Sequence, residues 1–193
     1  MSDLVLVRHA ATEWSGLRLC GRTDPSLSSA GRAQLAPLCE RVRGMALRDR
    51  TVLSSPARRA LETARAIAEA IGADVRVDDR LQEADLGRAD GMTFAELETA
   101  FPEIARAMAM GDPVDWPDGE TAGSLADRID ALARELEMGG VDRIVVTHGG
   151  PMRAFLTRSG LSSARLIAPA ELVVLRSTGS GGSTEMSLAD PAR

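Results

Sequence analysis

Two short apolar segments, each followed by a histidine, are the feature that most constrains the fold of this 193-residue chain. Residues 4–7 lead into Arg8 and His9, and residues 143–147 lead into His148. Such runs are too short for amphipathic helices and are typical of strands buried on both faces. Because ligands bind beyond the carboxyl ends of parallel strands, we expect the two histidines to lie side by side in a crevice.

An isolated Arg-His pair at a strand end would more often simply face solvent. The chain contains only two histidines, however, and both follow predicted strands, which favours a shared site. Gly149, Gly150 and Pro151 follow the second histidine and predict a helix N-terminus. Backbone N–H groups at such a terminus can bind an anion.

The composition restricts the chemistry of the site. All 23 basic residues are arginines, which excludes a Schiff-base lysine and the lysine of a P-loop. A net charge of −5 and an aromatic content of 3% argue against a nucleic-acid partner. The pattern contains neither an apolar run of about 20 residues nor a signal peptide, so we expect a cytoplasmic protein without membrane contact. Cys20 and Cys39 have no metal-like spacing and are expected to be free thiols.

The remaining pattern predicts an α/β protein in which all 193 residues form one domain. A Gly- and Pro-containing loop is expected over Ser15–Ser28, with Ser28 as the cap of the following helix. Beyond the two strands already described, the predicted strands cover Thr51–Leu53, Val75–Val77, Glu171–Arg176 and Ser183–Leu188. The last two strands are expected to form a hairpin. The predicted helices cover residues 28–45, 56–72, 93–110 with a break at Pro102, and 120–138.

Two neighbouring arginines occupy an unusual position in this pattern. Ser55 is predicted to cap a helix whose first residue is Pro56, which places Arg58 and Arg59 in the first turn. The positive end of a helix dipole disfavours each cation by roughly a few tenths of a kcal/mol, so these side chains need solvent or an anion. We expect Arg58 to face solvent and Arg59 to face inward, where a bound phosphate would supply the anion.

Glu83 and Asp85 lie in an acidic loop that ends at Gly87, and either could donate a proton to a substrate. A carboxylate in a loop is most often only solvated, so the pattern alone leaves this open.

The order of these segments resembles that of the histidine phosphatase superfamily, also called phosphoglycerate-mutase-like. The resemblance spans roughly residues 4–155 and is carried by Leu6-Val7-Arg8-His9 with Thr12, Gly21-Arg22-Thr23-Asp24 with Leu27, Gly31 and Gln34, Ser55-Pro56 with Arg59-Ala60 and Thr63-Ala64, Leu81 with Glu83 and Gly87, Gly119-Glu120, and Thr147-His148-Gly149. Ala10 replaces the usual glycine of the signature, Ala11 a frequent glutamate, and Ser15 an asparagine that often helps to hold phosphate.

The resemblance implies a three-layer α/β/α sandwich with a mostly parallel central sheet. It also implies a phosphatase that needs no metal or cofactor and hydrolyses a small phosphorylated metabolite through a phosphohistidine on His9. Glu83 would act as the acid, and His148 would take part in catalysis. The expected phosphate-binding residues are Arg8, Arg59, His148, Ser15 and Gly149, and Arg22 is expected to contact the substrate.

Two other functions remain open at this stage. The chain could be a phosphoglycerate mutase, although only 64 residues separate Glu83 from His148, which is short for the insertions that cover a mutase site. It could also be a catalytically weak protein that binds or senses a phosphorylated ligand, for which Ala10 and Ser15 are the hints. The sequence does not decide whether the protein is a monomer or a homodimer.

Overall fold

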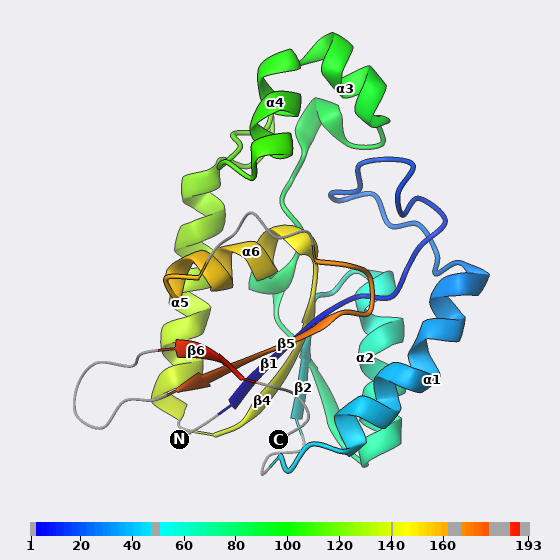
Figure 1. The fold of residues 1–193 in the computed structure, drawn as a ribbon, viewed down its shortest axis with the longest axis vertical. Coiled ribbons are helices and arrows are strands. Elements are labelled where there is room, and N and C mark those ends of the chain that lie inside the picture. Colours follow the sequence, from blue (N-terminus) through cyan, green and yellow to red (C-terminus); the bar gives the residue numbers. More distant parts are fainter. Residues whose placement is uncertain (1–2, 48–50, 140, 162–166, 178–185, 190–193) are drawn as a thin grey trace.

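A six-stranded sheet in the order β3-β2-β4-β1-β5-β6 forms the centre of the molecule (Figure 1). The computed structural model describes residues 3–47, 51–139, 141–161, 167–177 and 186–189. The strands are β1 (Asp3–Arg8), β2 (Thr51–Ser54), β3 (Asp74–Val77), β4 (Arg143–Thr147), β5 (Leu172–Ser177) and β6 (Met186–Ala189). The four strands from β3 to β1 pair in parallel, and β5 and β6 add an antiparallel edge, so the mostly parallel sheet is confirmed.

The pairing of β1 with β4 places the two histidines at the same level. Leu4 is aligned with Arg143, and Arg8 with Thr147, so each strand ends one residue before its histidine. The His9 backbone N–H donates to the Thr147 carbonyl at 2.9 Å and extends the ladder to the strand ends. The sequence prediction that parallel strands deliver the histidines to one edge is therefore confirmed.

Helices cover both faces of the sheet, which confirms the three-layer architecture (Figure 1). They are α1 (Ser29–Arg43), α2 (Arg58–Ile71), α3 (Phe94–Ala100), α4 (Pro102–Met110), α5 (Ala122–Gly139) and α6 (Gly149–Arg158). Helices α1 and α2 pack on the face that carries Val5 and Val7, and α5 and α6 pack on the face that carries Leu4 and Leu6. Alternate side chains of β1 thus enter two separate cores, as the period of a strand buried on both faces requires.

Residues 84–120 rise beyond the carboxyl edge of the sheet and include α3 and α4 (Figure 1). They have a small core of their own, which contains Leu86, Leu97 and Ala105 and against which Leu19 of the loop after β1 packs. The predicted break between two short helices at Pro102 is confirmed. This segment and the loop over Ser15–Ser28 lie on the same side of the sheet as the histidines.

Most predicted boundaries agree with the structure, but the start of α2 was predicted wrongly. Ser28 caps α1 as expected, because its hydroxyl accepts from the Gly31 N–H at 3.0 Å. Helix α2 begins at Arg58 instead of Pro56, and its N-cap is Ala57, which has no capping side chain. The reason is that Asp24, from a distant loop, accepts the Arg58 N–H at 2.6 Å. The turn between the predicted strands Glu171–Arg176 and Ser183–Leu188 lies outside the described residues.

Gly31 provides a test of how α1 is fixed beside the histidine segment. A Cβ at this position would lie 1.9 Å from the Ala11 carbonyl oxygen. Gly31→Ala should therefore lower the free energy of unfolding by about 1–3 kcal/mol, measured by urea denaturation. The control is Gly123→Ala in α5, where the nearest atom would be 3.9 Å away and no loss is expected. Equal stability of the two variants would contradict this account of the packing.

Candidate active site

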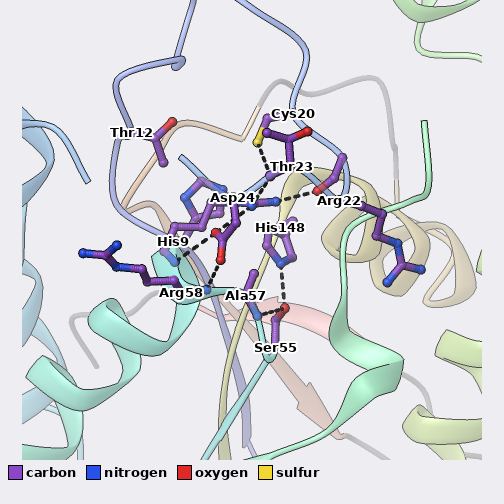
Figure 2. Close-up of polar contacts among 12 residues, drawn as sticks. His9, Thr12, Cys20, Arg22, Thr23, Asp24, Ser55, Ala57, Arg58 and His148 are labelled. Carbon is purple, nitrogen blue, oxygen red and sulfur yellow. Dashed lines mark hydrogen bonds and ion pairs between the residues drawn. The ribbon is translucent and has the colours of Figure 1, made fainter. Parts of the chain in front are cut away.

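His9 and His148 lie against each other at the carboxyl ends of β1 and β4 (Figure 2). Their ring centroids are 5.1 Å apart, and the ring planes meet at 62°. Both side chains are buried, His148 completely. The only two histidines of the chain therefore form one site.

A single hydrogen bond determines which nitrogen of His9 is free. His9 Nδ1 lies 2.8 Å from the Ala10 carbonyl oxygen. A carbonyl oxygen can only accept, so Nδ1 carries the proton and Nε2 keeps its lone pair. Burial, together with the positive charges of Arg59 and Arg8, lowers the pKa of His9 to about 3. The imidazole is therefore neutral near pH 7, as a nucleophile requires.

His148 is oriented by Ser55, the residue that follows the neighbouring strand β2. Its Nε2 lies 2.8 Å from Ser55 Oγ, which also accepts the Ala57 N–H at 3.3 Å (Figure 2). The serine predicted to cap α2 thus holds a histidine of the site instead. Complete burial, followed by the nearby His9 and Arg59, lowers the pKa of His148 well below its usual value. This second imidazole is also neutral.

Arg59 faces inward, as predicted, with only 1% of its surface exposed. Its guanidinium donates to the carbonyl oxygens of Gly21 and Thr23, both at 2.9 Å, and forms an ion pair with Asp24 at 3.1 Å. The anion that the sequence requires at this helix end is therefore the Asp24 carboxylate. Arg58 faces solvent, as predicted, and its side chain pairs with Glu62 of the same helix.

Arg8 lies beside the histidines, and its Nη1 donates to the Ile167 carbonyl at 2.5 Å. Burial lowers its pKa, and the negative charge of Glu83 partly offsets this. Within the described part of the chain, Arg8 Nε, Arg59 Nε and His148 Nδ1 are buried without a hydrogen-bond partner. Since buried donors are nearly always satisfied, the two guanidinium nitrogens indicate a ligand with acceptor oxygens. His148 Nδ1 can donate to the same ligand in the tautomer in which Ser55 donates to Nε2.

The side chain of Glu83 lies at the N-terminus of α6. Its carboxylate accepts the Gly150 N–H at 3.1 and 3.3 Å and the Ala84 N–H at 2.9 Å. A Cβ at Gly150 would lie 2.3 Å from Glu83 Oε1, so the carboxylate can reach this terminus only because the residue is glycine. Gly149 lies close to both Arg8 and Glu83, since a Cβ there would be 3.8 Å from Arg8 Cζ and 4.0 Å from Glu83 Oε2.

Of the two candidate acids, the structure brings Glu83 to the site and places Asp85 in a structural turn. The Asp85 side chain accepts the Gly87 N–H at 2.9 Å.

A cavity of about 150 Å³ opens beside Glu83 and Arg59; it is lined by Gly21, Arg22, Asp24, Pro56, Ala57, Arg59, Gln82 and Glu83. Arg22 is exposed at this cavity. Ser15 is turned toward the backbone of Thr12, whose N–H its hydroxyl accepts at 2.9 Å.

Several positioning residues were missed by the sequence analysis. Asp90 accepts the backbone N–H groups of Gly21 and Thr23 at 2.9 and 2.8 Å and so fixes the loop whose carbonyls hold Arg59. Thr63 links the Ala10 N–H, at 3.1 Å, to the Arg59 carbonyl, at 2.9 Å. Thr63 and Asp24 belong to motifs that the family resemblance contains, but their contacts depend on tertiary packing that the pattern does not specify.

The described ranges contain neither a membrane-spanning helix nor a cluster of metal-ligating side chains. None of their helices is long and apolar enough to cross a membrane. No three His, Cys, Asp or Glu side chains of these residues are grouped so that they could hold a metal ion. Independence from metal stays a prediction.

Paired neutral imidazoles and buried guanidinium groups at the carboxyl edge of an α/β sheet define a site of the phosphoryl-transfer class. Comparison with protein families agrees: the model of the histidine phosphatase superfamily, branch 1, matches residues 4–186. The chain therefore belongs to the histidine phosphatase superfamily, and the resemblance predicted from its motifs is confirmed.

Several named phosphatases are similar to this chain in sequence or in structure. The chain is 37% identical to the glucosyl-3-phosphoglycerate phosphatase of Mycolicibacterium vanbaalenii, covering 78% of this chain and 71% of that protein. It is 34% identical to phosphoserine phosphatase 1 of Hydrogenobacter thermophilus, covering 80% and 74%. A mycobacterial glucosyl-3-phosphoglycerate phosphatase solved with VO3 superposes with a TM-score of 0.85 at 28% identity, covering 97% of both chains. The match to a bifunctional protein of Mycobacterium tuberculosis, 35% identical, covers only 43% of that relative.

The lowered pKa values of the two histidines can be measured directly, because no other imidazole signal is present. In the folded protein neither ring should change its NMR shifts between pH 8 and pH 5, since burial disfavours both protonated forms. The unfolded chain binds these protons near pH 6.5, so the free energy of unfolding should decrease as the pH falls below that value. A ring that titrates near pH 6.5 in the folded state would contradict the described burial.

Proposed function

We propose that this chain is a metal-independent phosphatase that hydrolyses a small phosphorylated metabolite through a covalent phosphohistidine on His9. The observation that carries the proposal is a set of three buried nitrogens without hydrogen-bond partners in residues that lie beside His9 or act on its pKa. These atoms are Arg8 Nε in β1, Arg59 Nε in α2 and His148 Nδ1 directly after β4, and all three lack hydrogen-bond partners among the residues described. A phosphoryl group offers the oxygens that these atoms need, and guanidinium groups match its geometry.

In the first step, the Nε2 lone pair of His9 attacks phosphorus in line with the ester bond. The N–P bond forms as the P–O bond breaks, and the carboxyl group of Glu83 gives its proton to the leaving alcohol. Arg8 and Arg59 remain charged throughout and stabilise the charge that develops on the phosphoryl oxygens. His148 donates from Nδ1 when the Ser55 hydroxyl donates to Nε2.

In the second step, a water molecule attacks the phosphohistidine. The Glu83 carboxylate takes a proton from the water, the O–P bond forms and the N–P bond breaks. Inorganic phosphate leaves, and His9 regains its neutral imidazole. The Gly150 and Ala84 N–H groups hold Glu83 in place for both proton transfers.

Replacement of the nucleophile tests the proposed mechanism. His9→Ala should lower kcat for an aryl phosphate on the order of 10³-fold or more, because no other group takes over the attack. Wild-type enzyme quenched with alkali during turnover should carry phosphate in a base-stable, acid-labile linkage, and the variant should carry none. Circular dichroism serves as the control that the variant is folded. Substantial turnover by a folded His9→Ala variant would rule out the covalent role.

The openness of the cavity favours a phosphatase over a mutase. Exposed Arg22 and Asp24 line it, so water reaches the space beside Glu83. A mutase must protect its phosphohistidine from water while the intermediate reorients.

We therefore expect the enzyme to release free phosphate and not to interconvert phosphoglycerates. With 3-phosphoglycerate as the substrate and 2,3-bisphosphoglycerate as the primer, release of inorganic phosphate should greatly exceed formation of 2-phosphoglycerate. Both products are measured in the same reaction. Isomerisation that outruns phosphate release would contradict the phosphatase and support the mutase.

A further inference from the structure

Arg22 lines the cavity, but the two proposed reaction steps assign no role to its side chain. Gln82 and Glu83 line the same cavity, and Arg22 Nη1 donates to Gln82 Oε1. Gln82 immediately precedes Glu83, the proposed proton donor to the leaving alcohol. The Arg22 guanidinium is therefore held on the side of the cavity where the alcohol part of a substrate lies.

The positive charge of Arg22 is not neutralised by an ion pair with any residue that the structure describes. Two carboxylates that line the cavity, and Glu120, whose pKa the charge of Arg22 helps to lower, are already engaged by other groups. Asp24 pairs with Arg59 at 3.1 Å, Glu120 is bound by Arg128 at 2.7 and 2.8 Å, and Glu83 accepts backbone N–H groups of α6 and its own loop. An exposed guanidinium that contacts Gln82 and keeps further donors free thus lines the cavity.

We propose that Arg22, oriented by Gln82, binds a carboxylate on the alcohol part of the phosphomonoester. The inference rests on the proposed phosphatase function and narrows its substrate class to phosphorylated hydroxy acids. A carboxylate fits because a guanidinium binds it through two parallel hydrogen bonds.

A matched pair of substrates tests this specificity. 3-Phosphoglycerate and glycerol 3-phosphate share a three-carbon chain and differ mainly in a carboxylate that replaces a hydroxymethyl group. The wild type should prefer 3-phosphoglycerate by about 10- to 100-fold in kcat/KM, the size expected for a charge-assisted pair of hydrogen bonds. Arg22→Gln should reduce this ratio to about one, mainly through a higher KM for 3-phosphoglycerate. Arg22→Lys should keep only part of the preference, because it keeps the charge without the fork.

Arg58→Gln is the control for a general loss of positive charge. Arg58 is exposed, pairs with Glu62 and does not line the cavity, so the substrate preference should stay as in the wild type. A wild type that hydrolyses an aryl phosphate but turns over the two test substrates equally would overturn this inference alone. An unchanged preference in Arg22→Gln would do the same. Absence of hydrolysis of all three compounds would overturn the proposed function itself.

Discussion

The hydrogen bond between His9 Nδ1 and the Ala10 carbonyl is the interaction on which the proposed chemistry depends. It fixes the tautomer, because the carbonyl accepts only from a protonated Nδ1. The Ala10 N–H is held in turn by Thr63. The pairing of β1 with β4 then places this imidazole beside His148. A regular strand pairing thus brings an imidazole with a defined free nitrogen to the edge of the sheet, where the proposed mechanism uses it as the nucleophile.

The same arrangement explains how the site can bury cations before a substrate arrives. A guanidinium removed from water is costly unless it is paired and hydrogen-bonded. Asp24 and two carbonyl oxygens satisfy most of the Arg59 donors. Glu83 lies close enough to Arg8 to act on its pKa. Among the described residues, the guanidinium nitrogens that remain buried without a partner are Arg8 Nε and Arg59 Nε, and the proposed phosphoryl group would supply acceptors for both.

Sequence reasoning predicted the features that depend on local pattern and strand order. Both histidines lie at strand ends, Arg59 faces inward and Arg58 outward, and the layers and the parallel core of the sheet are as expected. It failed where a distant side chain decides the local structure. The start of α2 was misplaced because Asp24 caps it from another loop, which frees Ser55 to hold His148. The sequence pattern around α2 contains no signal for a capping side chain that lies 34 residues away in the chain.

The position of phosphorylation on His9 tests the central claim most directly. Phosphoenzyme formed during turnover can be trapped with alkali, digested under alkaline conditions and compared with the two phosphohistidine isomers by NMR. Since Nδ1 is committed to the Ala10 carbonyl, the account predicts phosphate on Nε2 of His9 alone. Phosphate on Nδ1 of His9, or on His148, would contradict it.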